Sequence, residues 1–593
     1  MLPQPIDRSQ KLKLILYYFK KNLRKIAAGV FCIIVVDLLQ LVVPQVVSRA
    51  VDILADADFD RHVLLTQCAV IVGAGVIMAL LRSGWRMLLM GSAWDLERGI
   101  RDELYTHMLS LDTAYYDKTR VGDIMAHATS DIVHVRMAFG FGIIALVDTL
   151  LLGSACIGIM VWTSPKLAAL CLIPLPFLVL VTKNLGNRMH QYHNTAQEAF
   201  SELTEQIRES FFGIRVIKVF NFEPQVRKKT ENHARDYFRK NLKRAYINAL
   251  LHPLLGLFFN ISTLIIVFYG GTLVMENRLS PGEFVAFIQY LGILAWPVIA
   301  IGWMTNLIQR GMASLKRINV LLNTRSQITF PEGTVMPDIV KGNIRFEKVC
   351  FSYDKKMNVL SGISMNIPAG ARIGITGPPG CGKTTLLSLI SRLYDPTSGR
   401  VCLDGKDLKT FDPQFLRRHI SFMAQEPFLF SGTLEDNILM GKSVSDSHDR
   451  DILDQVIKIC ALEETVDQMP DGLATLVGER GVTLSGGQKQ RVALARTLVS
   501  PKSVILLDDP VSQLDTRTAD RAIRGINRMN RDAVMIMVSH RLSALADCDR
   551  IYVMDNGRIA DQGTHEQLKA SNAFYRTSFN VQQSEGEPLG DRL

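Results

Sequence analysis

Several hallmarks of common protein classes are missing from this sequence of 593 residues. Its nine cysteines are scattered, and no two of them form a C-x-x-C pair. An odd cysteine count without a pairing framework favours reduced thiols that face the cytosol, and it excludes a disulfide-stapled secreted domain. The N-terminus also lacks the pattern of a cleavable signal peptide, so we expect no cleaved leader.

Acidic residues are in deficit, with 57 Asp and Glu against 67 Lys and Arg, and the net charge is +10. Nucleic-acid binding would explain this charge, but no run of basic residues is interleaved with aromatic residues. Basic residues instead flank apolar runs, as at Lys20, Lys21, Arg24 and Lys25. This positive-inside pattern predicts a lipid bilayer as partner and no nucleic acid.

Long apolar runs are present in the first half of the chain. They lie near residues 26–47, 63–82, 139–162, 165–183, 247–275 and 283–308. Each approaches the roughly 20 residues that a helix needs to cross the bilayer core. We therefore expect a six-helix, all-α transmembrane domain over residues 26–310, in a multi-pass protein of the cell inner (plasma) membrane.

The connections between these runs predict the orientation. Those after the first, third and fifth runs are short, and the first holds Asp52, Asp56, Asp58 and Asp60. The other two are long and rich in Arg and Lys, so both termini should be cytosolic. Residues 1–25 read as an amphipathic elbow on the inner membrane surface, although a simple extension of the first helix explains the pattern equally well.

The two long connections have helical periodicity and should extend into the cytosol. Each contains a glycine break, at Gly122 in YYDKTRVGDI and at Gly213 in ESFFGIRVIKVF. We expect a short helix at each tip, and a plain hairpin turn is the simpler alternative.

The second half of the chain predicts a soluble α/β domain over residues 341–580, after a linker at 311–340. Short apolar strands alternate with helices, which is typical of a parallel sheet covered on both faces. Residues 581–593 form a polar tail that we expect to be disordered.

A phosphate-binding loop follows one of these strands. The sequence GPPGCGKT runs from Gly377 to Thr384, between the strand ARIGIT and the helix TLLSLISRL. Its glycines allow backbone N–H groups to surround phosphates, Lys383 should reach the β- and γ-phosphates, and Thr384 should ligate Mg²⁺. The predicted nucleotide contacts are Gly377, Pro378, Pro379, Gly380, Cys381, Gly382, Lys383, Thr384 and Thr385.

An acidic motif, SVILLDDP, supplies the second part of a P-loop NTPase site. Asp508 ends a buried strand, where a carboxylate can hold Mg²⁺ through water, and Asp509 sits where a general base would orient the attacking water. These two motifs alone do not distinguish among P-loop NTPases.

The segment LSGGQKQR, Leu484 to Arg491, narrows the class. A serine and two glycines that open a helix make a second anion site. Because one chain already has a phosphate cradle, Ser485, Gly486, Gly487 and Gln488 should serve the ATP of a second chain. With this motif between the P-loop and its Asp strand, the sequence resembles the ABC ATPase family over essentially its whole length.

The resemblance implies further roles. Tyr353 matches the aromatic residue that stacks on adenine, although a core tyrosine at a strand end is an alternative. Gln425 matches the glutamine that contacts Mg²⁺ and the attacking water, and His540 the switch histidine near the γ-phosphate. Asp515 matches the residue that connects the two sites of the dimer. The segment LVGERG around Glu479, and the two tip helices, resemble features of ABC exporters.

One position departs from the family. The family usually has Glu after the Walker B Asp, and this chain has Asp509. Its carboxylate is one methylene shorter, so it should stand about 1.5 Å short of the water, a serious loss for geometry-limited proton transfer. Heterodimeric exporters often carry such a change in one subunit.

We therefore expect one half of a multidrug or lipid exporter, working with a non-identical second subunit and using ATP and Mg²⁺. A homodimeric lipid flippase and a mainly regulatory ATP-binding subunit are the alternatives. Polar residues inside the apolar runs include Asp37, Gln40 and Asp148. They suit a site for cationic amphipathic drugs, or hydrogen bonds between helices. Trp296 and Trp303 could stack on a substrate or face lipid equally well.

Overall fold

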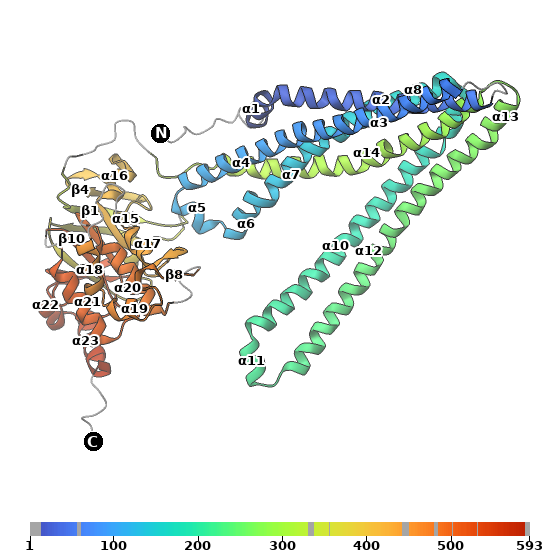
Figure 1. Ribbon diagram of the computed structural model, residues 1–593. Helices are drawn as coiled ribbons and strands as arrows, with labels where there is room; N and C mark the ends of the chain where they lie inside the picture. Colours follow the sequence, from blue (N-terminus) through green and yellow to red (C-terminus); the bar gives the residue numbers. More distant parts are fainter. Residues whose placement is uncertain are drawn as a thin grey trace. The chain divides into compact units, whose positions relative to one another are not determined.

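The computed structural model describes residues 13–55, 61–329, 337, 339–354, 356–441, 450–478, 484–500, 502–529 and 532–586. The chain divides into two compact units. The helical unit comprises Met1–Leu109 and Val121–Thr324, and the α/β unit comprises Ser110–Arg120 and Arg325–Leu593. Figure 1 shows the two kinds of architecture, long helices in one unit and sheets with short helices in the other.

The helical unit is made mostly of long helices, some of which continue into one another through π-helical segments. Its α-helices are α1 (Lys13–Lys21), α2 (Leu23–Ala55), α3 (Arg61–Trp85), α4 (Gly91–Ser110), α6 (Val121–Ala126), α7 (Ile132–Met137), α8 (Ile143–Thr163), α9 (Pro165–Leu172), α10 (Pro174–Phe212), α11 (Ile214–Val219), α12 (Glu223–Ile265), α13 (Gly271–Met275) and α14 (Pro281–Leu322). The π-helical segments are η2 (Arg86–Met90), η3 (His127–Asp131), η4 (Ala138–Gly142) and η5 (Ile266–Gly270).

Five helical stretches of the described residues are long and apolar enough to cross a membrane: Leu23–Ala55, Arg61–Ser110, Val121–Thr163, Gly256–Met275 and Pro281–Leu322. The apolar run predicted at 165–183 is divided between α9 and the start of α10. Pro174 stands at the first turn of α10, where a proline is tolerated because its missing N–H has no helical partner.

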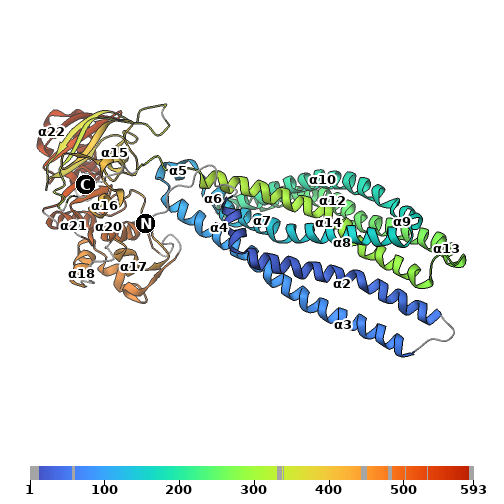
Figure 2. The ribbon, with the colours of Figure 1, turned by 90° about the horizontal axis from the view of Figure 1, so that it is seen from above.

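Within the helical unit, α10 and α12 run side by side as a long hairpin with α11 at its tip (Figure 1), and α2 lies beside α3 (Figure 2). Helix α14 packs against α2 and α8. Asp52 at the end of α2 accepts hydrogen bonds from Ser280 Oγ at 2.9 Å and from Gly282 N at 2.7 Å. A Cβ on Gly282 would lie 1.9 Å from Ser48 O, so the close approach of α14 to α2 requires glycine there.

The two tip helices, α5 and α11, differ in the kind of break that separates them from the neighbouring helices. The predicted break at Gly213 is found, since this residue ends α10 and α11 follows. The break predicted around Gly122 is found within YYDKTRVGDI but at Thr119 and Arg120, after the tip helix α5 (Thr113–Lys118), while Gly122 itself lies inside α6. Asp112 caps α5 by accepting from Tyr115 N, which fixes where the helix starts.

The α/β unit contains two large sheets rather than the one that the strand pattern predicted. One has the order β12-β11-β3-β10-β9-β6, and the other has the order β2-β1-β4-β5. The bounds are β1 (Ile344–Phe351), β2 (Leu360–Ile367), β3 (Arg372–Thr376), β4 (Ser398–Leu403), β5 (Lys406–Asp407), β6 (Ile420–Met423), β9 (Val504–Asp508), β10 (Val534–Val538), β11 (Arg550–Asp555) and β12 (Arg558–Gly563). A short pair, β7 (Gly432–Thr433) and β8 (Leu476–Val477), is antiparallel.

The single parallel sheet was therefore wrong for two of the predicted strands. β1 pairs antiparallel with both β2 and β4, so IRFEKVCFSY and VCLDG belong to the second sheet. A short connection joins β1 to β2, and such a connection returns the chain antiparallel. The strands that carry the phosphate loop and Asp508, β3 and β9, both run parallel to β10.

The helices of the α/β unit complete the fold. They are α5, α15 (Lys383–Ile390), α16 (Pro413–Arg418), α17 (Leu434–Leu439), α18 (Arg450–Ile459), α19 (Glu463–Asp467), α20 (Gly486–Leu498), α21 (Thr516–Arg528), α22 (His565–Ser571) and α23 (Ala573–Gly586). Because α23 continues through Gly586, the start of the predicted polar tail at 581–593 is helical. The remainder of that tail, and Glu479, lie outside the described residues.

Candidate nucleotide-binding site

The phosphate-binding loop joins β3 to α15 at the carboxyl end of the parallel strands. Gly377 has φ of 150°, and a Cβ there would lie 2.1 Å from Met554 O. Gly382 has φ of 98° and forms the N-cap of α15. Both positions therefore need glycine, and the loop leads directly into a helix N-terminus that favours anions.

Lys383 lies inside this loop with only 6% of its surface exposed. Its Nζ donates to Gly377 O and Pro378 O, both at 2.9 Å. The ammonium is thus held over the concave side of the loop by the loop's own carbonyls. An incoming phosphate can take over these donors without a large movement of the side chain.

Thr384 and Asp508 come from neighbouring elements, the start of α15 and the end of β9. Burial and the adjacent Asp509 carboxylate raise the pKa of Asp508, while the Thr384 hydroxyl acts in the opposite direction. Asp508 is 1% exposed, and its Oδ2 has no hydrogen-bond partner among the described residues. An orphaned carboxylate oxygen beside a hydroxyl fits a hard cation such as Mg²⁺.

Asp509 is held through its backbone on both sides. Its N donates to Val538 O at 2.8 Å, and its O accepts from Gln490 Nε2 at 2.8 Å. Its φ of 51° is left-handed, a region that Asp tolerates better than most residues because its short side chain bonds locally. Its carboxylate is 5% exposed and accepts from Ser539 Oγ at 3.3 Å.

The LSGGQ segment opens α20 with a capping box. Ser485 Oγ accepts from Gln488 N, and Ser485 N donates to Gln488 Oε1 at 2.8 Å. Ser485 and Gly486 are exposed, so the N-terminus of α20 faces outward from the unit. Gly486 and Gly487 leave no room for a side chain, because added Cβ atoms would lie 2.5 Å and 2.9 Å from atoms of Gln513.

Sequence analysis assigned no role to Gln490, although it is part of LSGGQKQR. It is fully buried, and besides Asp509 O its side chain bonds Ser512 Oγ and Gln513 N. This one side chain joins the helix that carries the second anion cradle to the segment that follows Asp508.

The predicted adenine contact, Tyr353, is 42% exposed. Its hydroxyl bonds Thr385 Oγ1 at 3.0 Å, so the ring stands beside the first turn of α15. The ring packs edge-on against Tyr394, with centroids 5.3 Å apart. One face remains open, which suits stacking on a flat base.

A hydrogen bond connects Tyr394, the neighbour of the Tyr353 ring, to the tip helix α5. Tyr394 donates to Asp117 Oδ2 at 2.5 Å, and this neighbouring carboxylate, together with burial, raises the pKa of the Tyr394 hydroxyl. Asp112 also accepts from Ser326 Oγ and Gln327 N. Helix α5 is thus fastened to the α/β unit at both ends, one of them next to the predicted adenine contact.

Two other predicted site residues, Gln425 and His540, lie in loops that follow strands of the parallel sheet. Gln425 follows β6, His540 follows β10, and both are exposed. These strands flank β9 on its two sides, so both loops stand at the edge that carries Asp508. Asp515 caps α21 by accepting from Thr518 N at 3.0 Å, which lowers its pKa.

A contact that sequence analysis missed holds the His540 loop. Gln582 of α23 donates to His540 O at 2.7 Å and accepts from Leu542 N at 2.9 Å. Gln582 lies in the segment predicted to be disordered, and nothing in its sequence surroundings marks it.

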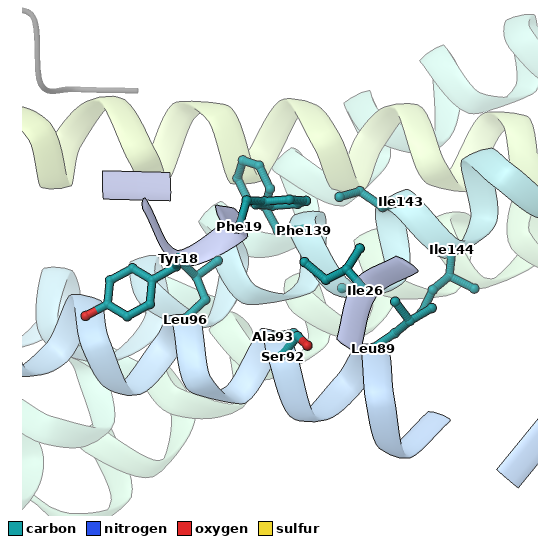
Figure 3. A pocket seen from close by; sticks show the side chains of 11 residues that line it. Tyr18, Phe19, Ile26, Leu89, Ser92, Ala93, Leu96, Phe139, Ile143 and Ile144 are labelled. Atoms are coloured by element: carbon teal, nitrogen blue, oxygen red, sulfur yellow. The ribbon is translucent and has the colours of Figure 1, made fainter. Parts of the chain in front are cut away.

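The helical unit contains an apolar pocket beside α1 (Figure 3). Tyr18 and Phe19 of α1 close one side of it, and a Cβ on Gly99 would lie 2.0 Å from the Tyr18 hydroxyl. Helix α1 therefore packs against α4. The other lining residues are Ile26, Leu89, Ser92, Ala93, Leu96, Phe139, Gly140, Ile143 and Ile144.

An α/β unit with a phosphate-binding loop and a second anion cradle, on one chain with helices long and apolar enough to cross a membrane, is the combination expected of an ATP-driven membrane transporter. Models of known families agree with this class. The ABC transporter transmembrane region matches residues 26–298, and the ABC transporter ATPase model matches residues 360–512.

Known proteins are similar over nearly the full length. The chain is 34% identical to the probable multidrug resistance ABC transporter ATP-binding/permease protein YheI of Bacillus subtilis, over 96% of this chain and 97% of that protein. It is 32% identical to the multidrug resistance-like ATP-binding protein MdlA of Escherichia coli, over 96% of each. A bacterial Atm1-family ABC exporter with ATP bound is 25% identical, with a TM-score of 0.78 over 94% of this chain and 99% of that one.

This chain belongs to the ABC transporter family. It is a multi-pass membrane protein that binds ATP and couples its hydrolysis to transport. Its fold is that of the ABC exporters, which function as dimers.

Proposed function

We propose that the chain is one half of a dimeric exporter that moves amphipathic small molecules, drugs or lipids across the membrane by alternating access. The observation that carries this is the pair of anion cradles on one α/β unit, at Lys383 and at Ser485. Each ATP would lie between the Lys383 loop of one subunit and the Ser485 helix of the other. Relatives named for multidrug resistance support drugs as one substrate class.

The proposed arrangement has six membrane helices, with α9 and the first part of α10 as the fourth. Both termini face the cytosol. The domains are the elbow at 1–25, the membrane domain at 26–310, the linker at 311–340 and the ATPase domain at 341–580. The exposed apolar face of α11, with Val216 and Val219, would dock on the partner's ATPase domain.

Thr384, Asp508 and Gln425 would hold Mg²⁺ together with phosphate oxygens and water. Bound there, the ion neutralises developing phosphate charge. Lys383 binds the β- and γ-phosphates, and the backbone N–H groups of the loop orient them. Tyr353 stacks on the base, and His540 contacts the γ-phosphate.

Asp509 is the proposed general base, and its surroundings support the proposal that it is a weak base. Its carboxylate is short, buried and already bonded to Ser539, while its backbone is held by Val538 and Gln490. Small backbone shifts therefore cannot bring it forward to the attacking water. We propose that this chain's own site hydrolyses ATP slowly and that its intact LSGGQ segment serves a better site on a non-identical partner.

The experiment that tests the exporter proposal is ATP-dependent uptake into inside-out vesicles. The assembly is purified from its native membrane, reconstituted, and given a fluorescent amphipathic dye or a short-chain labelled lipid. Uptake that requires ATP and is lost in Lys383→Ala supports export. Dye-independent transfer of lipid alone would favour the lipid flippase. Nucleotide binding with no transport of either probe would favour a regulatory subunit.

A further inference from the structure

The apolar pocket beside α1, which we call the elbow pocket, is lined by side chains from α1, α2, α4 and α8 and from the segments η2 and η4 (Figure 3). Only Tyr18 and Ser92 among its lining side chains carry a polar atom. Ser92 Oγ donates to Leu88 O at 2.8 Å, and the Tyr18 hydroxyl lies close to Gly99 of α4. The pocket therefore presents mainly hydrocarbon surface and suits an apolar occupant.

The lining of the elbow pocket is part buried and part exposed. Leu89, Ala93 and Leu96 are at most 6% exposed. Phe19 and Phe139 are half-buried, and their rings pack edge to face with centroids 6.0 Å apart. An apolar group that packs between these two sets of side chains leaves water, which favours its binding.

The joint between α1 and α2 carries basic side chains next to this pocket. Its helical hydrogen bonding continues, since Asn22 N donates to Tyr18 O at 3.0 Å and Ile26 N donates to Asn22 O at 2.9 Å. Tyr18 and Ile26 both line the pocket, so every residue between them lies within about two helical turns of it. The basic residues in this stretch are Lys20, Lys21, Arg24 and Lys25.

Most of the positive charge at this joint is uncompensated. Lys25 Nζ lies 3.1 Å from Asp95 Oδ2 of α4 and is paired. Lys20, Lys21 and Arg24 are exposed, and none of them forms an ion pair with an acidic side chain among the described residues. Three positive charges without a counter-charge therefore border one apolar pocket.

An occupant that satisfies both features combines hydrocarbon and negative charge in one molecule. A neutral lipid would leave the three cations without a counterion, and a cationic amphipathic molecule would be repelled by them. Inorganic phosphate would gain nothing from an apolar pocket. Anionic phospholipids have both parts, and clusters of Lys and Arg at the end of a membrane helix attract their headgroups.

We propose that the elbow pocket binds an anionic phospholipid, with part of one acyl chain in the pocket and the phosphate against Lys20, Lys21 and Arg24. Charge-assisted hydrogen bonds from these side chains to the phosphate oxygens hold the headgroup. The acyl chain contacts α1, α4 and α8 together. This lipid is a resident partner and not cargo, so the inference goes beyond the proposed export function and the binding needs no ATP.

The test uses the purified full-length assembly in a neutral detergent and a phosphatidylglycerol probe that carries a photoreactive diazirine at the end of one acyl chain. Labelled residues are mapped by peptide mass spectrometry over a lipid titration. We expect saturable labelling of the pocket residues of α4 and α8. A phosphatidylcholine probe with the same chains should need at least about tenfold more lipid for half-saturation, because its headgroup has no net charge. Glycerophosphoglycerol, the headgroup without chains, should not compete.

Variants separate the headgroup contacts from the pocket. Lys21→Gln and Arg24→Gln should each raise the half-saturating lipid concentration about fivefold. Lys229→Gln removes an exposed cation of α12 and should leave that concentration unchanged. Ala93→Phe fills the pocket and should abolish labelling there, with ATPase activity as the check that this variant is folded. The substitutions at Lys21 and Arg24 change only exposed side chains, so they carry the test if Ala93→Phe does not fold.

Four outcomes would overturn the proposal. These are equal labelling by the two lipid probes, a wild-type titration in both Lys21→Gln and Arg24→Gln, labelling confined to residues outside the pocket, and stronger labelling of a variant that lacks residues 1–12. The last would assign the pocket to the N-terminal segment. Because labelling needs no ATP, failure of the exporter proposal would leave this site standing, and failure of this site would leave the exporter proposal unchanged.

Discussion

Gln582 holds the His540 backbone to the last described helix, donating to His540 O at 2.7 Å while accepting from Leu542 N at 2.9 Å. Ser539, one residue earlier, bonds Asp509 Oδ1 and Arg541 N. The loop that presents His540 is therefore fixed both from α23 and from the base that it neighbours.

Gln582→Ala should reduce ATP turnover at this chain's own site about three- to tenfold, measured in an assembly whose other site is inactivated, because two hydrogen bonds that position the His540 loop are lost. The KM for ATP should change little, since no nucleotide contact is removed. Gln583→Ala, at an exposed neighbouring position, is the matched control. In a His540→Ala background the Gln582 substitution should have no further effect on turnover. Additive losses would mean that Gln582 acts only through general stability.

Lys383→Ala should abolish or severely weaken ATP binding at this chain's own site. The substitution removes the buried ammonium from the phosphate loop. Binding of labelled ATP is measured on the full chain. Lys409→Ala, on the surface of the same unit, should bind normally. Undiminished binding by Lys383→Ala would show that the loop holds no phosphate.

A cysteine at Asp58 should react with an impermeant thiol reagent in intact cells. The proposed orientation places this loop outside and α11 inside, so a cysteine at Lys218 should react only after lysis. Both variants are made with Cys68→Ser, because Cys68 is exposed and would add a background signal. The reverse labelling pattern would invert the topology.

The local fold of the phosphate loop was the part of the molecule best predicted from sequence. Local spacing determines a phosphate loop, since strand, glycines, lysine and helix follow one another directly. Pairing between distant segments was harder, and β1 and β4 were assigned to the wrong sheet because a short apolar strand does not specify its partner. The start of the tip helix α5 could not be predicted from the glycine pattern around Gly122, because the boundary is set by the Asp112 cap. Gln582 was missed because its role depends on where α23 folds back.

The membrane polar residues show a similar limit. From the sequence alone, Asp37 and Asp148 could belong either to a substrate site or to hydrogen bonds between helices. The hydrogen bond from Trp296 to Asp148 depends on the packing of α8 and α14, which apolar periodicity alone does not specify.

Asp509→Glu should increase hydrolysis at this chain's own site, since the longer side chain restores the reach of the carboxylate. The gain is read as single-turnover hydrolysis in an assembly whose other site is inactivated. No gain would indicate that the left-handed backbone at residue 509, rather than side-chain length, limits the base.

Steady-state ATPase activity of the purified native assembly tests the asymmetric dimer most directly. Loss of a general base costs about 10²–10⁴-fold at a competent site. Asp509→Asn should nevertheless change turnover little, because this site already contributes little, while Ser485→Arg should stop turnover by blocking the cradle that serves the partner's ATP. A chain that purifies alone as an active homodimer, and that Asp509→Asn inactivates, would contradict the proposal, because Asp509 would then be a working base.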